Sequence, residues 1–198
     1  MEAEINTRYT LRFDGLFRRL PGELSRVNRA GFMSYGWLVF QGNTLIARGH
    51  GVVARGTGAT STVAEYLALI EGLEALLDLG IQAEGIKVCG DAKCVIEQMR
   101  GEAAVKAGTM IPMHRRAMRL AQRFAKLRWI WTPRRHNKGA DSLTRLAMRQ
   151  MRQDKSRYLA AVRAIDPTRH DRMSSKFLPL VDLRVYQPGE TAVLAGLH

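Results

Sequence analysis

Every second residue of the segment 8–14 is apolar, which predicts a β-strand with one buried face. Two more apolar segments, residues 32–41 and 44–55, predict a second and a third strand, and the short turn between them predicts a hairpin. Arginines, glycine and Pro21 are frequent in residues 16–30, so we expect a long loop there, of the kind that is usually functional or disordered.

Apolar residues at helical spacing predict an amphipathic helix over residues 63–79, with Thr62 as its N-cap. The next segment, 86–90, is short and apolar, as a strand covered on both faces would be. Glu65 would lie in the first turn of the helix and Asp91 at the carboxyl end of the strand. Each also has an ordinary explanation, since Glu65 would favour the helix dipole and Asp91 could cap the next helix.

The chain continues with two more predicted helices and one strand. A helix from Pro112 to about Lys126 has one apolar stripe and an opposite stripe that carries only basic side chains. A strand at 128–132 and a helix containing Asp141 complete the order βββαβααβα. This order predicts an α/β fold with a mixed five-stranded sheet, its first three strands antiparallel and two more parallel through helical crossovers, with helices on both faces.

Basic residues are concentrated in one block of the chain. Residues 1–110 contain equal numbers of acidic and basic side chains, whereas residues 111–157 contain fourteen Lys or Arg and two Asp. Such a block indicates a polyanionic partner, most often nucleic acid. No apolar run reaches the roughly 20 residues needed to cross a bilayer, and the N-terminus is too polar for a signal peptide, so we expect a cytoplasmic protein without a membrane partner. The two cysteines, Cys89 and Cys94, predict buried free thiols rather than a disulfide or zinc site.

Four acidic residues stand at positions that the predicted topology brings to one end of the sheet: Asp14, Glu65, Asp91 and Asp141. Gathering four carboxylates without a cation would cost several kcal/mol in repulsion and desolvation. Carboxylate ligands suit Mg²⁺ or Mn²⁺, and a pair of such ions can activate water and stabilise the leaving oxygen in phosphodiester hydrolysis. The sequence therefore predicts a two-metal nuclease site.

The chain resembles ribonuclease HI of the RNase H-like superfamily, of the type that lacks the basic protrusion. The resemblance rests on F-D-G at the end of the first strand, Y-G-W-L-V-F, A-T-S-T-V-A-E-Y-L-A-L, V-C-G-D-A-K-C-V-I-E-Q-M-R-G and P-R-R-H-N-K-G-A-D-S-L, in this order. It implies an RNase H-like catalytic domain over residues 1–150 and hydrolysis of the RNA strand of RNA–DNA hybrids, leaving 5′-phosphates. It also implies that Asp14, Glu65, Asp91 and Asp141 are both the catalytic residues and the Mg²⁺ ligands.

The resemblance and the basic block together predict where a hybrid would be contacted. The expected contacts are polar or basic side chains around the acids: Asn28, Thr60, Ser61, Thr62, Arg116, Arg119, Arg123, Arg134, Arg135, Asn137 and Lys138. His136, five residues before Asp141, is a weaker candidate that could assist catalysis or contact a phosphate.

Two other functions remain open from the sequence. The spacing of His136 and Asp141 also fits a DEDD-type 3′-5′ exonuclease of the same superfamily, although such enzymes carry an Asp-x-Glu pair on the first strand, where this chain has Leu16. A noncatalytic nucleic-acid-binding module on the same fold would not need all four acids. Residues 151–198 form a C-terminal extension, helical to about residue 164 and extended near its end, which could dock on the core, pair with a second copy or contact another protein.

Overall fold

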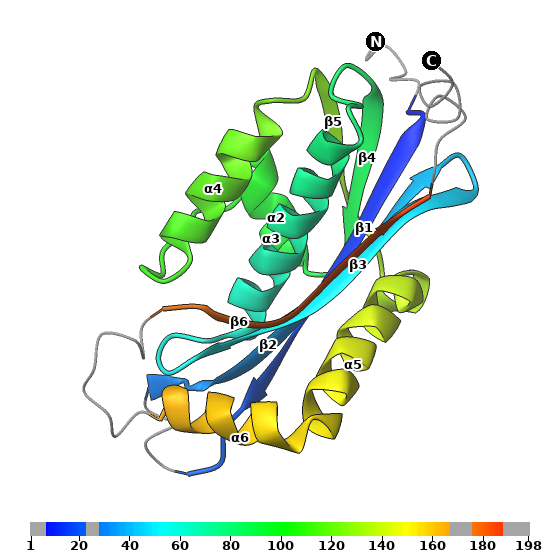
Figure 1. The fold of residues 1–198 in the computed structure, drawn as a ribbon. Helices are drawn as coiled ribbons and strands as arrows, with labels where there is room; N and C mark the ends of the chain where they lie inside the picture. Colours follow the sequence, from blue (N-terminus) through cyan, green and yellow to red (C-terminus); the bar gives the residue numbers. More distant parts are fainter. Residues whose placement is uncertain (1–6, 23–27, 167–175, 188–198) are drawn as a thin grey trace.

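One mixed sheet of six strands forms the centre of the protein (Figure 1). The computed structural model describes residues 7–22, 28–166 and 176–187. The strand order in the sheet is β5-β4-β1-β2-β3-β6; β4 is parallel to β1 and β5, and the other pairs are antiparallel. The strands are β1 (Tyr9–Arg19), β2 (Gly31–Gln41), β3 (Thr44–Arg55), β4 (Gly85–Gly90), β5 (Lys126–Trp131) and β6 (Leu178–Tyr186). The predicted five-stranded mixed sheet is confirmed, and β6 is an additional strand.

Helices cover both faces of this sheet (Figure 1). On one face α2 (Ser61–Asp78) packs against β1 and β2, and α3 (Lys93–Arg100) and α4 (Ile111–Ala121) lie beside it. On the other face α5 (Lys138–Gln153) crosses β1, β2 and β3, and α6 (Lys155–Ala164) follows. None of the helices in the described part of the chain is long and apolar enough to cross a membrane.

The alternation in the strands accounts for the two cores. Leu11 and Phe13 of β1 point to the α2 side and are fully buried in the larger core, which also contains most of α2. Phe32 of β2 contributes to a smaller core under α5 and α6, where its ring stacks on Tyr158 of α6 at 5.2 Å. The sheet therefore needs both helical layers to bury its apolar side chains.

Strand β1 is longer than the sequence predicts. Instead of turning into a loop after Asp14, it continues to Arg19, and residues 15–19 pair with β2 down to Gly31. Gly15 marks the place where α2 crosses closest to β1, because a Cβ atom there would lie 2.2 Å from the backbone carbon of Ala64. The glycine that looked like a strand end is thus a packing site. Part of the predicted loop, residues 23–27, lies outside the described residues.

Smaller differences concern helix ends and thiols. The side chain of Thr60, and not Thr62, caps α2 by accepting a hydrogen bond of 3.1 Å from the backbone N–H of Val63. Helix α4 ends at Ala121 rather than near Lys126, so that β5 can begin earlier than predicted. Cys94 is exposed on α3, whereas Cys89 is buried as expected.

The described part of the C-terminal extension docks on the core of its own chain. The predicted helix after residue 150 is interrupted at Asp154, which caps α6 through the backbone N–H of Arg157 at 2.9 Å. Strand β6 then pairs with β3. Its Arg184 forms ion pairs with three carboxylates of α2, at 2.6 Å to Glu71 and at 3.3 and 3.1 Å to Glu74 and Asp78.

We expect the substitution Arg184→Met to lower the free energy of unfolding by about 1–2 kcal/mol, because three carboxylates on α2 would lose their shared cation while remaining close together. Thermal or urea unfolding followed by circular dichroism measures the change. Arg163→Met on α6, an exposed arginine, is the matched control and should unfold like the parent protein. Equal unfolding of both variants would mean that the ion pairs of Arg184 do not stabilise the fold.

Candidate active site

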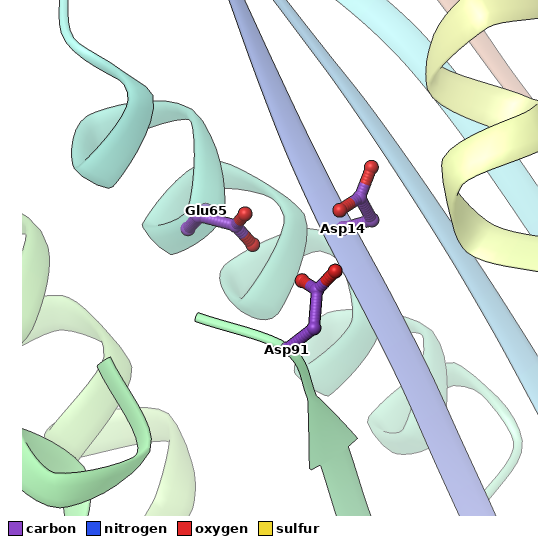
Figure 2. Close-up of side chains that lie close together, drawn as sticks. All are labelled: Asp14, Glu65 and Asp91. Atoms are coloured by element: carbon purple, nitrogen blue, oxygen red, sulfur yellow. The ribbon is translucent and has the colours of Figure 1, made fainter. Parts of the chain in front are cut away.

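Three acidic side chains from three separate elements lie together where β4 ends beside the central strand β1 (Figure 2). Asp14 comes from the middle of β1, Glu65 from α2, and Asp91 from the segment directly after β4. A carboxylate oxygen of each lies within 4.8 Å of one of each of the others. Asp91 does not cap α3, since that position is taken by Ala92 without a side-chain bond. The ordinary explanation of Asp91 as a helix cap is therefore excluded.

The topology of the sheet explains why these residues meet. Strand β4 ends at Gly90, which pairs with Phe13, so Asp14 is the first residue of β1 with no β4 neighbour. Beyond the end of β4, no β4 residue lies beside β1, and this leaves room for the side chains of Asp14 and Asp91. Helix α2 approaches the same point over Gly15, whose backbone N–H donates a hydrogen bond to the Glu65 carboxylate.

The cluster has more negative charge than its surroundings compensate. Asp14 is 3% exposed, and burial, followed by the charges of Asp91 and Asp141, raises its pKa from 3.8 to about 7. Burial, followed by Asp14 and Asp91, also raises the pKa of Glu65. The Oε2 atom of Glu65 is buried and has no hydrogen-bond partner. A buried acceptor without a donor, beside two more carboxylates, fits a cation bound among oxygen ligands, as Mg²⁺ prefers.

Asp141 lies next to this cluster but is held apart from it. Its carboxylate pairs with Arg134 at 2.6 Å and with Arg145 at 2.7 Å, and hydrogen bonding from Arg145 is the main cause that lowers its pKa. Thr144 links the two parts, because its hydroxyl lies 3.3 Å from Oδ2 of Asp14 and 2.7 Å from the backbone oxygen of Asp141. The structure thus brings three of the four predicted acids together and places the fourth beside them in an ion pair.

Several of the predicted nucleic-acid contacts have structural roles. Asn137 is fully buried, and its Nδ2 donates a 2.8 Å hydrogen bond to the backbone oxygen of Phe13, which ties the start of α5 to β1. In this arrangement it cannot reach a nucleic acid. The backbone oxygen of Asn28 accepts a 2.7 Å bond from Gly58, and Thr60 caps α2, so both shape the loop in front of Glu65. Ser61 and Thr62 follow in the first turn of α2.

The predicted basic contacts fall into two groups. Arg116, Arg119 and Arg123 are all exposed, and Arg116 also forms an ion pair with Glu74 of α2. Near the acids, Arg134, Arg135 and Lys138 are exposed and line a cavity of about 340 Å³ together with Asp141. His136 is exposed as well, with Nε2 3.0 Å from Nε of Arg135, and is not among the residues lining this cavity.

Three residues that shape the site were missed by sequence reasoning. Gly15 allows α2 to approach, Thr144 links Asp14 to Asp141, and Arg145 holds Asp141. The spacing of the last two was available in the sequence, since residues three and four positions after an aspartate share its helix face. The role of Gly15 could not be read in the same way, because it depends on where α2 crosses the sheet.

Comparisons with known proteins agree with this architecture. The family model described as reverse transcriptase-like matches residues 35–147, more than half of the chain. The chain belongs to this RNase H-like family. The N-terminal RNase H domain of Rv2228c from Mycobacterium tuberculosis, solved as a fusion with maltose binding protein, is 32% identical, with a TM-score of 0.62 over 76% of this chain and 99% of that chain.

Two further solved RNase H1 structures are similar to the RNase H-like domain. RNase H1 from the halophilic archaeon Halobacterium salinarum is 29% identical, with a TM-score of 0.62 over 72% of this chain and 98% of that chain. LC11-RNase H1, crystallised in complex with an RNA/DNA hybrid, is 23% identical, with a TM-score of 0.61 over 72% and 97%, a likeness that shows the fold alone.

A curated relative is similar to part of the domain. The bifunctional protein Rv2228c of Mycobacterium tuberculosis is 40% identical over 90 residues, which are 46% of this chain and 24% of that protein. The matched segment thus spans about a quarter of the length of the curated relative.

Proposed function

We propose that this RNase H-like domain is a metal-dependent endonuclease that hydrolyses the RNA strand of RNA–DNA hybrids. The observation that carries the proposal is the meeting of Asp14, Glu65 and Asp91 where β4 ends beside β1. A buried oxygen of Glu65 has no hydrogen-bond partner there. These three side chains would hold Mg²⁺ or Mn²⁺, which when bound supplies an activated water and charge stabilisation for phosphodiester hydrolysis. We assign this activity to residues 1–150.

The remaining residues of the site would position these acids. The Gly15 N–H fixes the orientation of Glu65, and Thr144 does the same for Asp14. Asp141, which the resemblance assigns to the same metal site, is oriented by Arg134 and Arg145. Because both arginine side chains are exposed to solvent beside Asp141, they are also available to the phosphates of a bound strand.

A hybrid is the substrate that the site and the family together favour. The basic residues near Asp141 suit a phosphate backbone, and solved RNase H1 structures are similar over most of the domain. The first turn of α2, with Ser61 and Thr62, lies next to Glu65 and offers hydroxyl groups for a minor groove. Hydroxyl contacts of this kind could detect the 2′-hydroxyl groups that distinguish RNA from DNA.

The proposal is tested by incubating the protein with Mg²⁺ and labelled RNA–DNA hybrid, single-stranded RNA, double-stranded DNA and single-stranded DNA in parallel. Internal cuts confined to the RNA of the hybrid, leaving 5′-phosphates, are the expected result. Stepwise release of mononucleotides from a 3′ end would instead indicate an exonuclease. Binding without any cleavage would indicate a noncatalytic module, and both of these results would contradict the proposal.

We expect the double substitution Arg119→Ala and Arg123→Ala to weaken hybrid binding and to reduce the slope of log affinity against log salt by about 0.9 for each phosphate that the variant no longer neutralises. Both side chains are exposed; Arg119 lies on α4 and Arg123 just after its end. Arg116→Ala should have a smaller effect on the slope, since its guanidinium is engaged with Glu74. Fluorescence anisotropy at several salt concentrations measures both. An unchanged slope in the double variant would show that this surface faces away from the hybrid.

A further inference from the structure

A second, larger cavity lies on the α5 side of the sheet, away from the catalytic carboxylates. Its volume is about 610 Å³. Leu38 and Phe40 of β2 and Thr10 of β1 contribute to its lining. The lining is also strongly basic. The described residues that form it include no carboxylate, and they include six basic side chains: Arg8, Arg12, Lys87, Arg135, His136 and Lys138. We call this cavity the sheet-face groove.

The groove exists because helix α5 leaves part of the sheet uncovered. The helix begins at Lys138 and packs on β1, β2 and β3, so β4 carries a polar residue, Lys87, on this face instead of an apolar one. The prediction that β4 is covered on both faces was therefore wrong for this position. Lys87 is half-buried and pairs in register with Thr10 of β1 on one side and with the exposed Arg128 of β5 on the other.

Within residues 7–22, 28–166 and 176–187, the basic side chains of the groove have few acidic partners. Lys87 and Arg128 are like charges on adjacent strands, an arrangement that costs free energy unless an anion screens it. Arg12 donates to the backbone oxygen of His136, a neutral partner, and Arg8 forms a long ion pair of 3.8 Å with the exposed Glu84. An unbalanced basic surface with a partly apolar floor is typical of a site for a polyanion.

The groove is continuous with the candidate active site. Arg135 and Lys138 line both the sheet-face groove and the smaller cavity that contains Asp141. Along β1 the distance from Asp14 back to Arg8 is six residues, or about 20 Å at a rise of ~3.3 Å per residue. This length corresponds to about six base pairs of a duplex at ~3.4 Å per pair. A strand that leaves the carboxylates in this direction would therefore run over the groove.

We propose that the sheet-face groove binds the phosphodiester backbone of the nucleic acid that extends beyond the active site, with Lys87 as a central phosphate contact. This inference rests on the proposed function, since it places the same hybrid along a second surface. It assigns a binding role to Arg8, Arg12 and Lys87, which lie outside the basic block of residues 111–157.

The test measures binding of a fluorescein-labelled RNA–DNA hybrid of about 20 base pairs, or ~70 Å, by anisotropy at several salt concentrations in EDTA, where metal-dependent turnover is absent. Lys87→Ala should reduce the slope of log affinity against log salt by about 1. Lys155→Ala, at the exposed start of α6, removes the same charge outside the groove and should leave the slope unchanged. Equal slopes for the Lys87 and Lys155 variants would overturn the inference.

A second variant keeps the test independent of the loss of one lysine. Thr10→Glu leaves every cation in place but adds a carboxylate to the floor of the groove, and we expect it to weaken binding by about tenfold. Circular dichroism establishes that both variants are folded. Cleavage of the hybrid in Mg²⁺ with unchanged binding by Thr10→Glu would refute the groove and leave the proposed function intact. Groove-dependent binding without any cleavage would support the groove and refute the nuclease.

Discussion

Asp14→Asn is expected to reduce cleavage of the RNA strand by about a thousandfold or more, equivalent to roughly 4 kcal/mol of transition-state stabilisation. Asp14 is the central member of the carboxylate cluster, since it adds repulsion to Glu65 and is itself affected by Asp91 and Asp141. Asparagine has nearly the same shape but offers a neutral oxygen, so the site would lose charge without losing its packing. Hybrid binding should persist or become tighter, because a negative charge near the phosphates is removed.

Single-turnover cleavage and anisotropy on the same preparations separate the two effects. Asp154→Asn is a matched control, because Asp154 lies outside the carboxylate cluster. It caps α6, and asparagine is an equally good cap. The control should cleave like the parent protein. Substantial turnover by Asp14→Asn, with the control also active, would show that the cluster is not the reaction centre.

We also expect the metal-free protein to become less stable as the pH rises. The folded-state pKa of Asp14 is raised to about 7, above its ordinary value of 3.8, so between these values the folded state binds more protons than the unfolded state. Stability from this group is therefore present at low pH and is lost as the pH passes through about 7. At roughly 1.4 kcal/mol for each unit of pKa difference, the loss by pH 8 is on the order of a few kcal/mol. The raised pKa of Glu65 acts in the same direction.

Thermal unfolding in EDTA at about pH 5.5 and about pH 8 measures the part of this loss that falls above about pH 5.5, roughly 2 kcal/mol for a pKa of about 7, and comparison with Asp14→Asn isolates the contribution of Asp14. The variant should show a smaller decrease between the two pH values, because its position 14 does not titrate. Mg²⁺ should stabilise the parent protein more at the higher pH, since bound carboxylates must be deprotonated. Identical pH dependence of parent and variant would mean that deprotonation of Asp14 does not destabilise the folded protein.

The sequence was sufficient for the order of elements from β1 to α5 and for the meeting of Asp14, Glu65 and Asp91, but not for the break before α6 or the pairing of β6. Strand and helix periods are local properties of the chain, and the rule that parallel strands present their carboxyl ends at one edge places Asp91 beside β1. The same topology brings the start of α2, and with it Glu65, to this point, and the family resemblance then favoured a role in the site for Glu65 over an ordinary interaction with the helix dipole. These predictions depended on short-range patterns or on motifs that are contiguous in sequence.

What the sequence did not reveal depends on contacts between distant elements. The extension of β1 to Arg19 requires the pairing partner β2, and the ion pair of Asp141 with Arg134 is decided by rotamers around the start of α5. The buried position of Asn137 follows from its bond to Phe13, a residue 124 positions earlier. Asn137 was therefore assigned to the substrate although its side chain holds the scaffold, whereas the other expected contacts stay predictions.

The docking of β6 has a practical consequence for handling this protein. Without that strand, β3 would become the open margin of the sheet, with unpaired backbone amides and carbonyls along residues 47–54. Exposed margins of this kind recruit other chains and promote aggregation. A shortened chain that ends after α6 would therefore be prone to precipitate, and recombinant boundaries should extend past Tyr186.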